Sequence, residues 1–299
     1  MIKYIDHFNI DREKWDTCVM YSSIPVIYAQ SWYLDVVCEK WDALVLNDYE
    51  AVMIISRKKK WGINYIYKPY FTQQVGIFSL KHNENELLPE FLKTIPANYK
   101  KIHLLLNITV HPEVKKYSFT KRINHILDTK DNYEVIAGRY ARRCKRNLKT
   151  AHNAGLELRN ETSIPDTIRF LEKYLGAQIT ELNTYVLNIL EKIISVTLNN
   201  KTGNILSLYN KEQEKVATLF YAANEKRCTL LVCASSPEGL KYQAMYLLID
   251  SVIRLYAGTG TTIDFFGSSI ESIAYFNLSF GTTATEYYLV SSKSLFGLL

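Results

Sequence analysis

Three short runs in the second half of the chain decide the fold. They are NILSLY (204–209), KVATLFYAA (215–223) and RCTLLVCA (227–234). Each run is rich in β-branched and aromatic residues, and the polar segments NKEQE and NEK separate them. Such runs are typical of strands, and connections this short join antiparallel neighbours. The sequence therefore predicts a three-stranded antiparallel meander.

Helices and strands alternate around this meander. In KYQAMYLLIDSVIRLYAG (241–258) apolar residues recur at helical spacing, and Gly258 provides a stop. TTIDFFG (261–267) is a predicted buried strand, and SSIESIAYFNLSFG (268–281) is a predicted short helix that ends at a glycine. The same signals predict helices at about 164–179 and 181–198 and a closing strand at 285–290.

The first half repeats this order of elements without a repeat at the level of residues. Its predicted elements are a helix at 31–40, strands at 41–47 and 50–58, a helix at 84–95 and a strand at 101–107. We therefore expect an α/β protein with mixed sheets (α+β in arrangement), built as two similar domains in tandem. The expected domains are residues 1–135 and 136–299.

A helical segment at about 133–154 carries a cluster of charge. Six basic residues and no acidic one fall between positions 139 and 149; they are Arg139, Arg142, Arg143, Lys145, Arg146 and Lys149. Four apolar residues share one stripe, so the helix is expected to dock by a narrow seam; they are Tyr140, Cys144, Leu148 and Ala151. The basic side chains either form a solvated face or bind the phosphates of a polyanion such as tRNA.

Composition places the chain among soluble, cytoplasmic proteins. A length of 299 residues favours two domains, and a net charge of +6 is too small for a dedicated nucleic-acid binder. The N-terminus has no signal-peptide pattern, and no apolar run is long enough to span a membrane. The five cysteines are scattered, which predicts free thiols in a reducing compartment. Cys228 and Cys233 are expected to be buried packing residues.

Several common signatures fail. The six histidines have no metal-ligand spacing, so no metal is expected. GTGTT (258–262) precedes a strand and is therefore a turn, not a dinucleotide fingerprint. Lys58, Lys59 and Lys60 form a second basic cluster, which is expected to lie at a hairpin turn.

Four segments resemble one protein family. They are RNLKTAHNAG (146–155), PYFTQQVGIFS (69–79), IDFFGSS (263–269) and YFNLSFG (275–281). Together, and in this order of elements, they resemble the Fem-type aminoacyltransferases, which are peptidoglycan-bridge enzymes built from two GNAT-like domains. The resemblance implies a GNAT-type acyl-CoA N-acyltransferase fold. It also implies transfer of an acyl or aminoacyl group to an amine, such as that of a cell-envelope precursor.

The resemblance leaves the acyl donor open between aminoacyl-tRNA and acyl-CoA. In GNAT folds the loop after the meander binds a pyrophosphate, and here that loop is SSPEGLKYQ (235–243). It has a single glycine, Gly239, and Glu238 would repel phosphate, so tight CoA binding is disfavoured. Many relatives carry Phe-Lys where this chain has Phe276-Asn277, which puts ligase chemistry in doubt.

Candidate site residues come from both sources. Asp264 ends a predicted central strand, where ligands of open α/β sheets bind, and could accept a proton from an amine; alternatively it is a paired structural carboxylate. Tyr275 stands where some GNAT enzymes place a general acid, or it is a packing tyrosine. Gly267, Ser268 and Asn277 are expected to border the same pocket.

The remaining site residues lie elsewhere. By resemblance alone, Tyr70, Gln73 and Gln74 are expected to line a cleft of the first half. The expected phosphate or nucleic-acid contacts are Arg139, Arg142, Arg143, Arg146 and Lys149.

Three functions stay open. The favoured one is an N-acyltransferase or aminoacyltransferase of the Fem-like branch. The second is a CoA-dependent N-acyltransferase acting on a nucleotide-linked amino sugar or small amine. The third is a non-catalytic ligand-binding protein that retains the fold.

Overall fold

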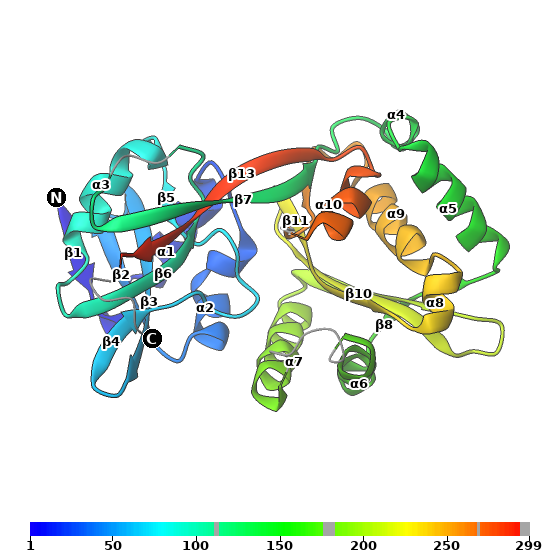
Figure 1. Ribbon diagram of the computed structural model, residues 1–299, viewed down its shortest axis with the longest axis horizontal. Coiled ribbons are helices and arrows are strands. Elements are labelled where there is room, and N and C mark those ends of the chain that lie inside the picture. The colour runs from blue at the N-terminus through cyan, green and yellow to red at the C-terminus, as the bar shows by residue number, and fades with distance from the viewer. Residues whose placement is uncertain (111–113, 176–182, 268–269, 294–299) are drawn as a thin grey trace. The chain divides into compact units, whose positions relative to one another are not determined.

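The computed structural model describes residues 1–110, 114–175, 183–267 and 270–293, which form two compact units (Figure 1). Of these described residues, those up to 123 and those from 285 to 293 belong to the first unit, and those from 124 to 284 belong to the second. The chain therefore returns to the first unit at its end, which the sequence analysis did not anticipate.

The first unit is built on a mixed sheet in the order β1-β2-β3-β4-β6-β13. Its strands are β1 (Ile2–Ile5), β2 (Trp41–Leu46), β3 (Ala51–Lys60), β4 (Ile63–Ile66), β5 (Ile77–Ser79), β6 (Tyr99–Leu106), the start of β7 (Tyr117–Leu127) and most of β13 (Thr283–Ser292). β5 pairs with β3, and β4 runs parallel to β6. The helices are α1 (Arg12–Tyr21), α2 (Ser31–Val37) and α3 (Glu84–Thr94), with short 3-10 turns at His7–Asn9 and Ile27–Ala29.

The second unit contains the predicted meander. Its sheet has the order β7-β12-β11-β10-β9-β8, in which only β11 and β12 are parallel. Its strands are β8 (Glu157–Glu161), β9 (Gly203–Tyr209), β10 (Lys215–Ala223), β11 (Arg227–Ser235) and β12 (Thr262–Asp264). Its helices are α4 (Tyr133–Gly138), α5 (Arg142–Asn153), α6 (Ile164–Leu175), α7 (Thr184–Asn199), α8 (Pro237–Lys241), α9 (Ala244–Tyr256) and α10 (Glu271–Leu278). The predicted order of elements is therefore confirmed.

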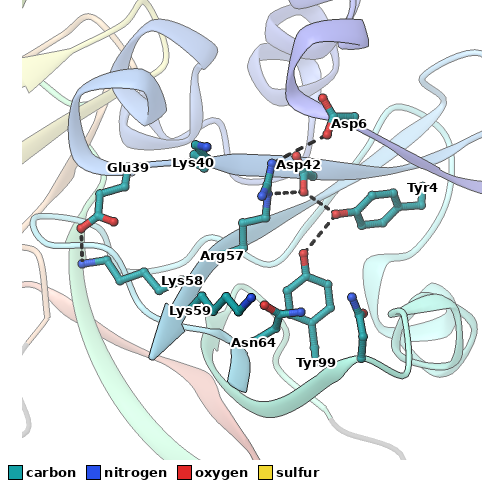
Figure 2. Close-up of a pocket in the computed structure, with 11 residues that line it drawn as sticks. Tyr4, Asp6, Glu39, Lys40, Asp42, Arg57, Lys58, Lys59, Asn64 and Tyr99 are labelled. Carbon is teal, nitrogen blue, oxygen red and sulfur yellow. Dashed lines mark hydrogen bonds and ion pairs between the residues drawn. The ribbon is translucent and has the colours of Figure 1, made fainter. Parts of the chain in front are cut away.

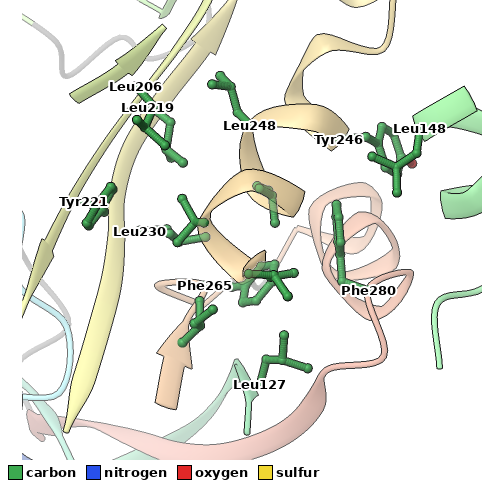
Figure 3. Close-up of a cluster of buried hydrophobic side chains, with 14 of the residues drawn as sticks. Leu127, Leu148, Leu206, Leu219, Tyr221, Leu230, Tyr246, Leu248, Phe265 and Phe280 are labelled. Carbon is green, nitrogen blue, oxygen red and sulfur yellow. The ribbon is translucent and has the colours of Figure 1, made fainter. Parts of the chain in front are cut away.

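The core of the second unit lies between the sheet and α9. Figure 3 shows Leu248 of α9 facing Leu219 and Leu230 on the strands, with Phe265 and Phe280 closing the cluster. All five side chains are buried. α5 packs on the outer side of α9, and α6 and α7 cover the opposite face of the sheet (Figure 1).

Two predicted helices are each divided in two. The segment 241–258 is interrupted at Gln243, whose φ of 57° is left-handed, so the regular helix begins at Ala244. The segment 133–154 is interrupted at residues 139–141, where the amide of Ala141 donates to the carbonyl of Ser279. Because of this break, Arg139 is not part of the helix that carries the other basic residues.

The cysteines follow the prediction in part. All five are free, and Cys228 is buried as expected. Cys233 is exposed, so the prediction for this residue is wrong. The physical reason is a register shift of β11 against β10, which is described below.

Candidate functional site

The parallel pairing of β11 and β12 is short. It covers three residue pairs, from Arg227↔Thr262 to Thr229↔Asp264. β11 continues to Ser235, whereas the chain leaves β12 through two left-handed residues, Phe266 with φ 56° and Gly267 with φ 62°. From Leu230 onward, β11 therefore has no β12 partner among the described residues. Brief pairing followed by divergence leaves the later residues of β11 without a strand partner on this side, among the described residues.

An irregularity in β11 changes which face its side chains occupy. The register with β10 shifts between Phe220 and Tyr221, so that Leu231 is the extra residue on β11. Bulges re-aim side chains and are over-represented next to active sites. Cys233 and Ser235 follow the shift; Cys233 is exposed, and the Oγ of Ser235 is buried without a hydrogen-bond partner. Binary patterning could not reveal this shift, because a strand pattern presumes an unbroken period of two.

Asp264 is fully buried, and both of its carboxylate oxygens are engaged. Oδ1 accepts hydrogen bonds from the Asn124 side chain at 2.9 Å and from the Phe266 amide at 2.8 Å. Oδ2 accepts from Arg227 through Nε at 2.8 Å and through the terminal nitrogen at 2.7 Å. These contacts favour the structural alternative for Asp264, since no oxygen is left for a reacting amine. A signal was present in the sequence, where Arg227 is the one charged residue of its strand.

Tyr275 and Arg143 are brought together. The Tyr275 side chain is 62% exposed, and the guanidinium carbon of Arg143 lies 3.3 Å from its ring centroid. Arg143 also donates to the carbonyl of Tyr275. Phe276 points the other way, into the core against Tyr246 and Phe280. The phenol of Tyr275 is thus accessible beside a cation, an arrangement in which it can act on a negatively charged leaving group.

Asn277 lies on the same helix and is buried. Its exposed fraction is 4%, and its Nδ2 has no hydrogen-bond partner. Its backbone carbonyl accepts from the Thr282 hydroxyl. An unsatisfied buried donor costs about 1–3 kcal/mol and is unusual enough to need an explanation. Ser268, the remaining predicted member of this pocket, lies outside the described residues.

Three contacts involve the start of α8, where a GNAT fold would bind a pyrophosphate. The Oγ of Ser236 accepts the amide of Gly239 at 3.1 Å, which uses the donor that a phosphate would need. A Cβ placed on Gly239 would lie 2.1 Å from the carbonyl oxygen of Val216, so this glycine serves close packing. Glu238 borders the same point, where it accepts from Asn210 at 2.9 Å. That CoA is bound weakly stays a prediction.

A pocket of about 660 Å³ adjoins this helix start. Ser236 and Glu238 line it from one side, and aromatic and basic residues of α6 line it from the other. Lys215 at its base forms an ion pair with Glu161 at 2.7 Å. Burial alone would raise the pKa of Glu161, but its hydrogen bonds and the Lys215 charge lower it to about 2. Glu161 is therefore ionised at neutral pH.

The basic residues of α5 form one exposed stripe. Arg142, Lys145, Arg146 and Lys149 are all exposed, and at 100° per residue they fall within about 100° of arc, opposite the buried seam. Among the described residues, no carboxylate forms a salt bridge with any of these four. Two basic residues of the cluster lie apart from this stripe: Arg139 precedes the break before α5, and Arg143 is stacked on Tyr275. Arg139 pairs with Asp131.

A buried network ties the chain just before α5 to α9. Oδ1 of Asp250 accepts from the hydroxyls of Tyr133 and Tyr140 at 2.9 and 3.0 Å, and Oδ2 accepts from Arg254 at 2.9 Å. Burial and the Asp250 charge raise the pKa of both tyrosines, so the hydroxyls stay protonated as donors. The seam residue Cys144 is likewise buried, which raises its pKa to about 12. The stripe therefore lies on a helix whose opposite face packs against α9.

The predicted residues of the first unit are mostly buried. Gln73 and Gln74 are 5% and 4% exposed, and the side-chain amide of Gln74 donates to Gln73 at 3.1 Å. The backbone amide of Gln74 donates to the Tyr28 hydroxyl. Tyr70 is half-buried on the same segment. Their role in a ligand cleft stays a prediction.

A polar pocket of about 510 Å³ lies elsewhere in the first unit (Figure 2). At one end, the buried carboxylate of Asp42 pairs with Arg57 at 2.5 Å and accepts from the Tyr4 hydroxyl, which lies 3.1 Å from that of Tyr99. The rest of the pocket has a mixed lining of basic, acidic and amide side chains, namely Lys40, Lys58, Lys59, Asp6, Glu39, Asn64 and Asn98. None of the predicted site residues lines it.

Two classes of feature are absent from the part of the chain that is described. No cluster of three or more His, Cys, Asp or Glu side chains is placed to hold a metal ion. None of the helices there has the length and apolar character needed to cross a bilayer.

Comparison with known proteins identifies the fold. No family model matches the sequence, and no curated protein is significantly similar to it in sequence. In structure, the chain is similar to FemX, with 12% identity and a TM-score of 0.66 over 96% of both chains. It is also similar to the C-terminal domain of a protein from Agrobacterium fabrum that is named as a lysylphosphatidylglycerol synthetase, with 11% identity and a TM-score of 0.60 over 95% of this chain and 92% of that one.

A third similar structure is a tandem GNAT protein from the clavulanic acid biosynthesis pathway, with 8% identity and a TM-score of 0.51 over 98% of both chains. Each match spans nearly the whole chain. The chain therefore has the mixed α/β fold of Fem-like tandem GNAT proteins, and the predicted fold is confirmed.

Proposed function

We propose that this protein is a GNAT-type N-acyltransferase that transfers an aminoacyl group from a polyanionic donor to an amine. The observation that carries the proposal is the open edge of β11 beyond Thr229, which lies in a unit of GNAT-like fold. Fold alone does not specify a reaction. The open edge, the accessible Tyr275 phenol and the basic stripe of α5 are the local features that support this one.

The reaction needs no nucleophile on the enzyme. The acceptor amine attacks the acyl carbon of an ester, a C–N bond forms, the ester C–O bond breaks, and the amine proton leaves as the alcohol gains one. Backbone amides along the open edge of β11 would stabilise the developing oxyanion. Tyr275 would protonate the leaving alkoxide, assisted by the charge of Arg143, which is stacked on its ring.

The contacts at α8 and α5 favour tRNA over CoA as the carrier. The Gly239 amide is already used by Ser236, so the usual pyrophosphate donors are incomplete. Arg142, Arg146 and Lys149 on α5 are exposed and spaced one turn apart, which suits a phosphate backbone. The acceptor would be a small or nucleotide-linked amine, such as that of a cell-envelope precursor.

A donor comparison tests the proposal. Purified protein is incubated with a generic amine acceptor and either a mixture of aminoacyl-tRNAs or a set of acyl-CoAs, and amide formation is followed by mass spectrometry. Transfer from aminoacyl-tRNA that falls by about 10²-fold or more in Tyr275→Phe supports the assignment. Acyl transfer from acyl-CoA but not from aminoacyl-tRNA would instead support the CoA-dependent alternative. Tight tRNA binding without any transfer would leave the non-catalytic alternative.

Salt dependence tests the α5 stripe separately. Each phosphate contact contributes about 0.7 to 0.9 to the slope of log affinity against log salt. Replacing Arg142, Arg146 and Lys149 by Gln should therefore lower the slope for tRNA by roughly 2 to 3. Arg143→Gln serves as a comparison, because its guanidinium is stacked on Tyr275 and should alter transfer more than the slope. An unchanged slope in the triple variant would leave α5 as a solvated face.

A further inference from the structure

The hairpin between β3 and β4 ends in an exposed tryptophan. Trp61 is 78% exposed and Ile63 is 43% exposed. Trp61 and Gly62 form a two-residue turn with φ values of 50° and 79°. Such turns favour Asn, Asp or Gly at the first position, and a bulky residue at positive φ is an outlier. The conformation of the turn therefore does not explain why a tryptophan stands there.

Lysines surround this tip. Lys59 and Lys60 precede Trp61 and are exposed, and the ammonium of Lys60 lies 4.6 Å from the Trp61 ring centroid. The stretch RKKKWGIN (57–64) contains no acidic residue. Lys100 and Lys101 are exposed on β6, which pairs with β4 beside the hairpin. The tip thus combines apolar side chains with a concentration of positive charge.

The polar pocket continues this surface (Figure 2). Lys59 and Asn64 are a cross-strand pair of the hairpin and also line the pocket, together with Lys40. Within the described residues, no carboxylate forms a salt bridge with Lys59 or Lys40. The three carboxylates that line the pocket are each paired with another cation: Asp42 and Asp6 with Arg57, and Glu39 with Lys58. Two cations are therefore free to bind a phosphate at the base of the tip.

We propose that the β3–β4 hairpin and this pocket dock the protein on an anionic lipid bilayer. Trp61 and Ile63 would enter the headgroup region, where tryptophan is enriched in membrane proteins. Lys60 would lie beside the headgroups, and Lys59 and Lys40 would hold a lipid phosphate in the pocket. Charge complementarity selects this occupant, because an apolar tip ringed by lysines matches an anionic surface and not a neutral one. The proposal is independent of the acyltransferase function.

Vesicle co-sedimentation tests the charge requirement. Vesicles are made of phosphatidylcholine alone or with phosphatidylglycerol added. Each lysine near an anionic surface contributes about fivefold in affinity, so Lys59→Gln with Lys60→Gln should weaken binding to the anionic vesicles by about 25-fold. The matched control is Lys115→Gln with Lys116→Gln. These two lysines are also exposed and also precede an aromatic residue, but that residue, Tyr117, is buried and cannot enter a bilayer. The control should bind as the unaltered protein does.

Tryptophan fluorescence tests the position of the tip. Trp15 and Trp41 are fully buried, so a blue shift on adding anionic vesicles should come from Trp61. Trp61→Phe should abolish the shift, and Trp32→Phe should retain it. Inorganic phosphate, which can occupy the pocket without a bilayer, should give no shift.

Three results would overturn the proposal. Equal binding to neutral and anionic vesicles would remove the role of the lysines. Absence of binding to either vesicle would remove the role of the surface. Self-association without lipid that is lost in Trp61→Ala would assign the tip to a second copy of the chain.

Discussion

Asp264→Asn separates a structural role of this carboxylate from a catalytic one. In the folded protein its two oxygens accept four hydrogen bonds, two of them from Arg227, which is 7% exposed. An asparagine has one acceptor oxygen and one amide nitrogen. Whichever way it turns, that nitrogen faces donors, either those of Arg227 or those of Asn124 and Phe266. At least two hydrogen bonds are lost, and the Arg227 charge is left uncompensated.

The expected cost follows from these contacts. Removing one partner of a buried ion pair destabilises a protein by about 3–5 kcal/mol, which is a large share of a typical stability of about 5–15 kcal/mol. Chemical denaturation followed by circular dichroism measures this loss. Arg227→Met combined with Asp264→Asn should recover part of it, because the unpaired charge is then removed.

Two outcomes would refute this reasoning. One is a free energy of unfolding for Asp264→Asn within about 0.5 kcal/mol of the unaltered protein. The other is a variant that remains folded while its aminoacyl transfer falls by about 10²-fold or more, which is the range expected for loss of a general base. The second result would restore Asp264 to the catalytic role that its position at a strand end first suggested.

Four further changes have expected results of different sign. Tyr140→Phe removes one of the hydrogen bonds to the buried Asp250 carboxylate and should lower the free energy of unfolding by about 1.5 to 3 kcal/mol in chemical denaturation; no change would mean that α5 does not depend on this anchor. Gly239→Ala should lower it by about 1 to 3 kcal/mol because of the contact with Val216, whereas Gly138→Ala, where nothing lies within 4 Å, should raise it by about 0.4 to 1 kcal/mol. Burial lowers the pKa of His125, so the unfolded chain takes up the proton first, and stability is lost as pH falls through the unfolded pKa of about 6.5. His125→Gln should therefore lose less stability than the unaltered protein between about pH 7.5 and about pH 5.5; equal losses would mean that His125 does not contribute.

The elements found from the sequence are those with a clear hydrophobic period. The meander and α9 carry such patterns, and their bounds agree with the expected ones within a few residues. β8 (ELRNE) and β7 (YSFTKRINHIL) were missed because their patterns are largely polar. Among the described strands β8 pairs with β9 alone, so a polar edge strand suffices there. α1 was missed because few of its residues are buried.

The candidate site was less accessible from sequence for a different reason. Partners such as Arg227 for Asp264, or Arg143 for Tyr275, are far apart along the chain, and local propensity carries no information about them. The exposure of Cys233 depends on a register shift that alternation conceals. The basic stripe was predicted in part. Its residues were identified from the sequence, but the direction that they share became clear only from the position of the helix break at residues 139–141.

The break before α5 links these observations to function. In a continuous helix from Tyr133, Arg139 would lie next to the basic stripe. Tyr133 and Tyr140 would be separated by about 700° of rotation, about 20° less than two full turns, and would therefore lie two turns apart on one face of a straight helix. The break instead lets both hydroxyls reach the same oxygen of Asp250 and lets the Ala141 amide bond to Ser279, just beyond α10. α5 is thereby fixed to α9 and to the end of α10, the helix that carries Tyr275 and Asn277. A polyanion bound along the stripe would consequently be held in a constant position relative to the proposed general acid, which is what transfer from a tRNA-linked ester requires.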